Sequence, residues 1–257
     1  MLSRVNLCLG AAAVAAAVTM SAGAFAATVN LSFDRFERSG LDAARAARAG
    51  YESGLKLKGV ETFNGYTAWN GSSGTSNPQN TKVGSFTSFG AAGSGGSVVS
   101  DGSKLQVRGD DMPWGRYGTA ADRPLGGNWL DSNDNLGMRW KIAGVGKFNA
   151  VSFFVLDAAD VGGKFSIKVG DTLYSNIAGA AGRLANGNIH FVKIILDEAV
   201  TNLTVELMHN KTNDGFGIDG AAVGLAPVPL PPAALLLGTG LVGLVGLRRR
   251  RRAATTA

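Results

Sequence analysis

Short apolar and β-branched runs, separated by turn residues, follow one another from Gly59 to Leu225. Most of them are rich in Val, Ile, Phe, Thr or Trp, and Gly, Asn, Asp and Ser punctuate them. This pattern is typical of short strands in an all-β domain. It predicts an antiparallel β-sandwich. The expected strands read "VETFNGYTAW", "VGSFTSF", "SVVSDGSKLQVRG", "LGMRWKI", "FNAVSFFVLDA", "KFSIKVGDTLY", "NIHFVKIIL", "TNLTVELMH" and "FGIDGAAVGL".

A helical pattern precedes these strands. We expect an amphipathic helix from Ser39 to about Leu55, with Ser39 as its N-cap and Asp42 completing a pair similar to a capping box. Apolar residues recur at helical spacing and share one face of it, namely Leu41, Ala44, Ala47, Tyr51 and Leu55. Because this helix comes before the strands instead of alternating with them, a parallel α/β sheet is not expected.

The first 26 residues have the three parts of a secretory signal peptide. Arg4 supplies the basic region, Leu7–Met20 is apolar, and Ala24 and Ala26 place small residues before a cleavage point. A buried N-terminal helix is the alternative, but an alanine run followed by A-F-A fits a signal better. We therefore expect signal peptidase to remove residues 1–26.

Near the C-terminus, residues 233–247 read "AALLLGTGLVGLVGL", an uncharged stretch of 15 residues. As a helix it would be roughly 22 Å long, whereas a membrane-spanning helix usually has about 20 residues. Arg248–Arg252 follow at once and are expected to stay on the cytoplasmic side. Three interpretations are open: a permanent single-pass anchor, a buried C-terminal core helix, and a transient sorting signal.

The flanks of this stretch complete a pattern of three parts: a proline motif, the apolar stretch and the arginine cluster. The motif residues are Val228, Pro229, Leu230, Pro231 and Pro232, and the cluster residues are Arg248, Arg249, Arg250, Arg251 and Arg252. Residues 227–254 thus resemble the VPLPA-CTERM sorting domain, a variant of the PEP-CTERM signals that exosortases handle in Gram-negative bacteria. The fifth motif position is Pro232 rather than alanine, and Ala233 follows it.

This resemblance implies a route for the protein. The precursor would insert into the inner membrane, with the core outside and the tail inside. An exosortase would then process it and release or transfer it to the cell surface or the extracellular space. Proteins with such signals commonly travel with exopolysaccharide or biofilm matrix. The implied partners are therefore signal peptidase, exosortase, the membrane and exopolysaccharide.

Removing both ends changes the charge balance. The chain has 25 Lys and Arg and 19 Asp and Glu, and 19 basic residues remain without Arg4 and Arg248–Arg252. The core is then formally neutral, which argues against a nucleic-acid partner. Cys8 is the only cysteine and lies in the signal, so the mature chain has neither disulfides nor thiolate metal sites. The remaining residues, about 200, suffice for one domain.

We divide the chain into the signal peptide 1–26, a segment 27–58 with the helix, a β-sandwich domain 59–226 and the sorting signal 227–254. After the helix come "ETFNGY", "GRYGTAADRPLGGNWLDSNDN" and "NDGFGIDGAAVG". This order resembles the jelly-roll sandwiches of many PEP-CTERM-type precursors. The resemblance implies a mostly β, jelly-roll-like antiparallel sandwich preceded by one short α-helix, and it supports the fold more than any activity.

The stretch "DSNDN" places oxygen ligands at alternate positions, at Asp131, Asn133 and Asn135, as calcium loops do. Ile142 stands where an EF-hand has its glutamate, so an EF-hand is excluded. A sandwich-type calcium site is left open, and calcium is the one cofactor considered. Its further ligands would be Asp157 or Asp160, or Asp214 and Asp219. The alternative is a turn, since Asx side chains commonly bind nearby backbone N–H groups.

Three aromatic residues, Trp114, Tyr117 and Trp129, fall in a loop-rich middle segment. Exposed rings there would stack on sugar rings, whereas buried rings would pack in the core or against loops. Trp140 alternates with Met138 in an expected strand and is therefore assigned to the core.

Catalytic motifs are absent from the sequence. The histidines His190 and His209 lie in strand-like segments outside any H-E-x-x-H motif. There is no G-x-S-x-G elbow and no P-loop, and no carboxylate pair stands out for a glycosidase. We therefore expect a non-catalytic exported protein of the surface or matrix. The alternatives are a carbohydrate-binding module, with or without calcium, and a hydrolase of matrix polysaccharides.

Overall fold

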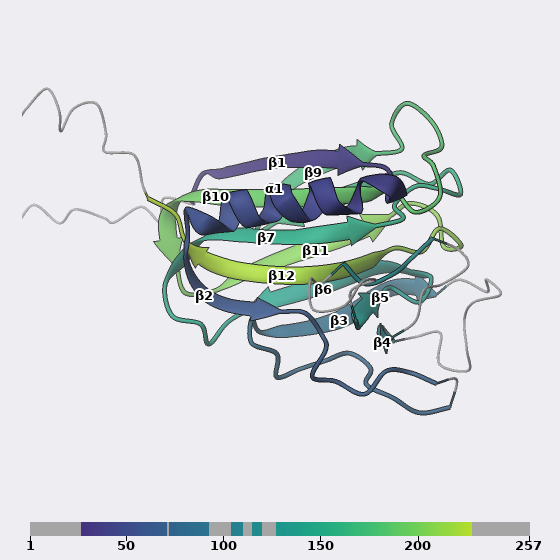
Figure 1. Cartoon of the computed structure of the whole chain (residues 1–257), viewed down its shortest axis with the longest axis horizontal. Coiled ribbons are helices and arrows are strands. Elements are labelled where there is room, and N and C mark those ends of the chain that lie inside the picture. Colours follow the sequence, from purple (N-terminus) through teal and green to yellow (C-terminus); the bar gives the residue numbers. More distant parts are fainter. Residues whose placement is uncertain (1–26, 71, 93–103, 110–114, 120–126, 228–257) are drawn as a thin grey trace, which may run out of the picture.

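The computed structural model describes residues 27–70, 72–92, 104–109, 115–119 and 127–227 (Figure 1). The predicted signal peptide, the proline motif, the apolar stretch and the arginine cluster lie outside the described residues. Within the described part, no helix is both long and apolar enough to cross a membrane.

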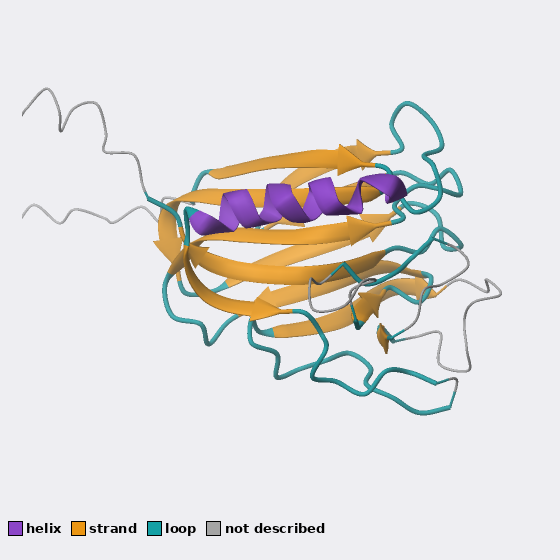
Figure 2. Cartoon of the chain, viewed as in Figure 1, coloured by secondary structure: helices purple, strands orange, loops and turns teal. Residues whose placement is uncertain are grey.

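The described chain is mostly β, with two antiparallel sheets and one α-helix (Figure 2). The first sheet has seven strands in the order β1-β10-β7-β12-β5-β4, with β2 also paired to β12. The second has five, in the order β3-β6-β11-β8-β9. The strands are β1 (Val29–Phe36), β2 (Lys56–Glu61), β3 (Ser85–Ala92), β4 (Gln106–Arg108), β5 (Trp129–Asp131), β6 (Asn135–Ile142), β7 (Phe148–Leu156), β8 (Phe165–Val169), β9 (Thr172–Ala178), β10 (Ile189–Val200), β11 (Leu203–His209) and β12 (Gly217–Leu225).

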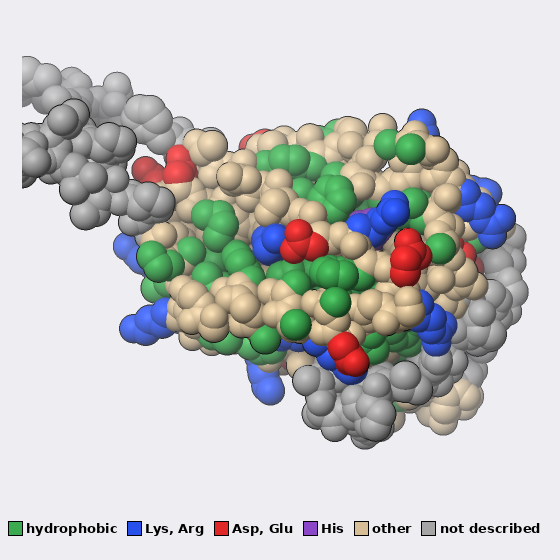
Figure 3. All heavy atoms as spheres, turned by 45° about the horizontal axis from the view of Figure 1, so that its top comes forward, with side chains coloured by type: hydrophobic (Ala, Val, Ile, Leu, Met, Phe, Trp, Pro, Cys, Tyr) green, Lys and Arg blue, Asp and Glu red, His purple; other side chains and the backbone are tan. Residues whose placement is uncertain are grey.

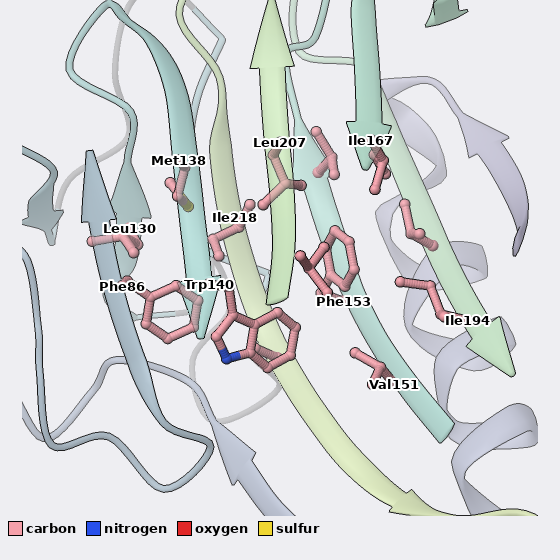
Figure 4. Packing of buried hydrophobic residues seen from close by; sticks show 14 of the residues in the cluster. Phe86, Leu130, Met138, Trp140, Val151, Phe153, Ile167, Ile194, Leu207 and Ile218 are labelled. Atoms are coloured by element: carbon pink, nitrogen blue, oxygen red, sulfur yellow. The ribbon is translucent and has the colours of Figure 1, made fainter. Parts of the chain in front are cut away.

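Side chains from both sheets share one hydrophobic core (Figure 4). In β6, Trp140 is buried while its neighbours Arg139 and Lys141 are exposed, as expected for a strand with one face on the core. The indole stacks on Phe86 of β3 with ring centroids 5.3 Å apart and meets Phe153 of β7 edge-on at 5.8 Å. The assignment of Trp140 to the core is confirmed.

Helix α1 (Leu41–Ser53) covers the other face of the seven-stranded sheet, over β7 and β10 (Figure 1). Because one face of β7 packs on the core and the other under α1, all of its residues are buried. Ala44 faces a second apolar cluster that includes Phe154 and Phe191. Tyr51 packs edge-on against Phe191 with ring centroids 5.9 Å apart. The predicted helix is confirmed, although it ends at Ser53. Four of the five predicted apolar residues, Leu41, Ala44, Ala47 and Tyr51, lie in this cluster, whereas Leu55 follows the helix.

The predicted start of this helix is wrong. Ser39 does not cap it, because it lies inside a 3-10 turn (Arg38–Gly40) in which the Gly40 N–H donates to the Glu37 carbonyl at 2.8 Å. Gly40 occupies the N-cap position and makes no side-chain cap hydrogen bond. Leu41 therefore begins the α-helix.

The segment 27–58, for which only a helix was expected, also contributes strands to the first sheet. Strand β1 pairs along its whole length with β10, from Val29 opposite Leu196 to Phe36 opposite Ile189. The predicted strand "KFSIKVGDTLY" is instead a hairpin of β8 and β9. Gly170 has a φ of 56° at its turn, a conformation that glycine adopts without strain.

The predicted strand "VETFNGYTAW" is shorter in the structure, since β2 ends at Glu61. Phe63, with a φ of 58°, turns the chain away and buries its ring in the core. The Glu61 carboxylate accepts a hydrogen bond from the Phe63 N–H at 2.7 Å and stabilises this turn.

Candidate functional site

Buried charged residues gather where β5, β7 and β11 end and β12 begins. Each has at most 7% of its surface exposed. We call this group the acid–arginine cluster, and its members are Arg116, Asp131, Asp134, Asp157, Asp160, His209 and Asp214. The charges lie close enough to influence one another's protonation, so the group behaves as one electrostatic unit.

Arg116 supplies the positive charge of the cluster. Its Nη1 lies 2.8 Å from Asp131 Oδ1 and 3.6 Å from Asp134 Oδ1. Burial by itself lowers the pKa of Arg116, but the carboxylates around it outweigh burial and raise that pKa. A Cβ at position 215 would overlap the Arg116 guanidinium, which explains why Gly215 follows Asp214 in "NDGFGID".

Each of the three predicted calcium ligands makes a hydrogen bond within the protein. Asp131 Oδ1 accepts a hydrogen bond from the Asn133 N–H at 3.1 Å, which closes an Asx turn. Asn133 Nδ2 donates to the Lys104 carbonyl at 3.1 Å, and Asn135 Nδ2 donates to the Ser132 carbonyl at 2.7 Å. This geometry matches the turn that the sequence left open as the alternative to calcium.

No group of three or more His, Cys, Asp or Glu in the described part of the chain is arranged to hold a metal ion. Next to Asp131 and Asp134, the guanidinium of Arg116 supplies a positive charge. Asp219, one of the further calcium ligands considered, binds Thr119 instead. Its Oδ2 accepts hydrogen bonds from the N–H and the hydroxyl of Thr119, at 2.6 and 3.0 Å.

Two carboxylic acids of the cluster hold their protons unusually strongly. Burial raises the pKa of Asp157 to about 8; the hydrogen bond from the Gly187 N–H, 2.7 Å long, opposes this rise, and the charge of Asp160 adds to it. Burial also raises the pKa of Asp160 to about 6, with a further contribution from Asp214. At neutral pH the cluster therefore carries less negative charge than its composition suggests.

His209 and Asp214 form the innermost part of the cluster. The His209 Nδ1 lies 3.5 Å from Asp214 Oδ1, and both side chains are fully buried. Burial lowers the pKa of His209, although the nearby Asp214 carboxylate opposes this effect. Asp214 also accepts a hydrogen bond from the Gly163 N–H. The rings of Phe165 and Phe216 flank the imidazole and separate the pair from water.

Of the three aromatic residues considered for sugar binding, two are buried. Tyr117 packs under Arg38, whose guanidinium lies 4.6 Å from the ring centre, and donates its hydroxyl to the Gly187 carbonyl at 3.3 Å. Trp129 is fully buried beside Gly217. Neither offers a free ring face for stacking on a sugar, and Trp114 lies outside the described residues.

The cluster joins segments that are far apart in the sequence. It contains Arg116, which the sequence did not single out, and Asp157, Asp160 and Asp214, which it considered only as calcium ligands. The ion pairs of Arg116 with Asp131 and Asp134 join loops at this end of the sandwich.

Comparison with known proteins assigns no family. No family model matches the chain, and no curated protein matches it. The function is therefore inferred from the residues alone.

Proposed function

We propose that this protein is an exported, non-catalytic component of the cell surface or extracellular matrix, associated with exopolysaccharide. The signal-like first 26 residues and the three-part pattern of residues 227–254 carry this proposal, and the buried charges bear only on its non-catalytic part. The carboxylic acids with raised pKa values in the acid–arginine cluster, Asp157 and Asp160, have at most 7% of their surface exposed. Perturbed groups that serve catalysis sit in clefts that a substrate can enter.

The order of the strands supports a jelly-roll-like sandwich as the fold. One sheet contains the run β5-β12-β7-β10 and the other contains β6-β11-β8-β9. In this arrangement consecutive strands alternate between the sheets, apart from the β8–β9 hairpin, as in the two interlocked Greek keys of a jelly roll. Jelly rolls serve many binding and structural functions, so the fold is compatible with the proposal but does not define it.

The described chain begins and ends at the same end of the sandwich (Figure 1). Thr28 and Pro227 line one cavity there. The Thr28 N–H donates to Asp197 Oδ1, and the Ala226 N–H donates to Asn149 Oδ1, each at 2.7 Å. Hydrogen bonds thus fix both ends of the described chain next to the predicted signal and sorting segments. This supports the treatment of those two segments as separate from the folded domain.

The described surface offers mixed charges to a partner. On the face around helix α1, acidic and basic side chains are scattered among apolar and small polar ones (Figure 3). This distribution does not favour a nucleic-acid partner, because phosphate backbones are bound by clustered basic residues. A cavity between β1 and β9 favours the second candidate function, a carbohydrate-binding module.

Intact-mass analysis of the expressed precursor tests the proposal. We would express it in a host that carries an exosortase and compare the membrane and secreted fractions. We expect a secreted species that lacks residues 1–26 and everything beyond about Val228–Pro232. A control precursor with Pro229→Ala and Pro231→Ala should stay in the membrane fraction at full tail length. If the unaltered tail is found only in membranes, it is a permanent anchor and the sorting proposal is wrong.

A further inference from the structure

A cavity of about 340 Å³ opens between the outer strands of the two sheets. Strand β1 is the last strand of the seven-stranded sheet, and β9 is the last strand of the five-stranded sheet. The cavity lies where these edges face each other, and residues 179–181 border it after β9. Apolar side chains, including Ile177 and Leu184, form much of its wall. Its volume is at the small end of the range for small-molecule pockets.

Sheet register brings three unlike side chains together in this cavity. Arg35 of β1 lies directly opposite His190 of β10, so the two side chains share a face of the sheet. Phe33, two residues before Arg35, shares that face as well. Its ring centroid lies 5.7 Å from that of His190. All three residues line the cavity.

The cation in this cavity is only weakly engaged by the protein. The Arg35 side chain is 51% exposed, and its ion-pair partner Glu37 is 3.8 Å away and 55% exposed. An exposed pair of this length contributes little to stability. Replacing Glu37 by an anionic ligand as the partner of Arg35 therefore costs little free energy. No Asp or Glu belongs to the described lining of the cavity. A planar guanidinium of this kind is suited to binding a carboxylate through two hydrogen bonds.

His190 adds an unsatisfied polar group. Only 2% of its surface is exposed, and its Nδ1 has no hydrogen-bond partner. Burial, aided by the nearby charge of Arg35, lowers the pKa of His190 to about 4. The imidazole is therefore neutral at physiological pH and can either donate or accept a hydrogen bond at each nitrogen according to its tautomer. Buried polar groups without partners are uncommon in proteins and favour a ligand that satisfies them.

Phe33 is the third of these side chains in the cavity. Phe33 is 37% exposed, which is unusual for a phenylalanine on the core side of a strand. An accessible ring beside a cation and a neutral hydrogen-bonding group matches the three surfaces of a sugar acid. These surfaces are an apolar ring face, a carboxylate and hydroxyl groups.

We propose that the cavity between β1 and β9 binds one hexuronate residue of an acidic polysaccharide. Phe33 packs on the sugar ring, Arg35 binds the carboxylate, and His190 exchanges a hydrogen bond with a hydroxyl. The small volume admits one ring, so the chain of the polysaccharide continues outside the cavity. This inference rests on the proposed association with exopolysaccharide and names the ligand class and the residues that recognise it.

Calorimetric titration of the protein purified from its exosortase-bearing host tests this inference. The probes are trigalacturonate, trimannuronate, neutral galactotriose and inorganic phosphate. We expect saturable binding of at least one uronide, about tenfold or more tighter than galactotriose, because a charge-assisted hydrogen bond is lost with the carboxylate. Arg35→Gln should weaken uronide binding by about tenfold or more, and Phe33→Ala should also weaken it.

Arg139→Gln is the matched control. Like Arg35, this arginine is about half exposed and pairs with a glutamate, but it belongs to the outer face of β6 and does not line the cavity. It should leave uronide binding unchanged. The inference is overturned if neither uronide binds at millimolar concentration, if galactotriose binds equally well, or if Arg35→Gln has no effect. Phosphate binding as tight as that of the uronides would overturn recognition of the sugar.

The two proposals can fail separately. A protein that reaches the matrix but binds no uronide contradicts only the cavity assignment. A protein that binds uronides through Arg35 but is never exported contradicts only the proposed function.

Discussion

Arg116 and Arg139 each form an arginine–carboxylate ion pair, one buried and one at the surface. The guanidinium lies 2.8 Å from a carboxylate oxygen in both cases, that of Asp131 for Arg116 and that of Glu206 for Arg139. The Arg116 side chain is 4% exposed, whereas that of Arg139 is 45% exposed. Distance therefore does not account for a difference between the two pairs, whereas burial and the second carboxylate beside Arg116 do.

Replacing each arginine by methionine removes the charge and keeps an unbranched side chain. At position 116 the change leaves Asp131 and Asp134 buried without their cation, and breaking a buried pair in this way costs about 3–5 kcal/mol. At position 139 the remaining Glu206 is still partly exposed, with 18% of its side chain accessible, and a surface pair contributes about 0–1 kcal/mol. We expect Arg116→Met to lower the free energy of unfolding by about 3–5 kcal/mol and Arg139→Met by at most about 1 kcal/mol.

Urea denaturation at neutral pH, followed by tryptophan fluorescence, measures both values. A double variant, Arg116→Met with Asp131→Asn, should recover part of the loss, because a neutral amide can be buried at lower cost than an unpaired carboxylate. The reasoning is refuted if Arg116→Met falls within about 1 kcal/mol of the parent protein. It is also refuted if Asp131→Asn lowers stability further in that background.

Other perturbations test further parts of the structure. The pKa of Asp157 is raised to about 8, so the native state holds a proton that the unfolded state has lost. Between about pH 7 and 8, where the histidines are mostly neutral in the unfolded state as well, stability should fall with rising pH, by less than about 1.4 kcal/mol per pH unit. Asp157→Asn should abolish that slope in urea titrations across the same range, and an unchanged slope would contradict the assignment. Trp140→Ala should cost about 3–5 kcal/mol by thermal or urea unfolding, since the indole is fully buried between Phe86 and Phe153; a loss below about 1 kcal/mol would show that the core can close the gap. Gly217→Ala should lower the melting temperature, because its Cβ would lie 2.8 Å from the Trp129 ring, whereas Gly144→Ala has open space but a φ of 78° and tests backbone strain alone.

Periodicity predicted much of this fold, because the strands and the helix each have one buried face. Leu41, Ala44 and Tyr51 recur at helical spacing, and the same residues contact the sheet. Strand β1 was missed although Val29 and Leu31 alternate with polar residues. The eight residues of β1 follow the predicted signal peptide closely. Their pattern is too short to distinguish a strand from a continuation of that peptide.

The acid–arginine cluster could not be predicted from the sequence, for a different reason. Asp131 and Asn133 have the spacing of calcium ligands, but the same spacing forms an Asx turn, and only the position of Arg116 distinguishes the two. Arg116 is 15 residues from Asp131, and the link between them exists only in the folded chain. Likewise, Arg35 and His190 become neighbours through strand register rather than through any motif.

The cavity between β1 and β9 and the two ends of the described chain lie toward opposite ends of strand β10. His190, in the lining of this cavity, lies near the start of β10. Asp197, which accepts a hydrogen bond from the Thr28 N–H, lies near its other end. Extended strand over that interval covers roughly 20 Å. Electrostatic screening in physiological salt acts over about 8 Å. Under the proposed sorting route, Arg35 would therefore lie more than two screening lengths from the chain ends that lead to the membrane segments, and anionic headgroups beside those ends would not compete for it.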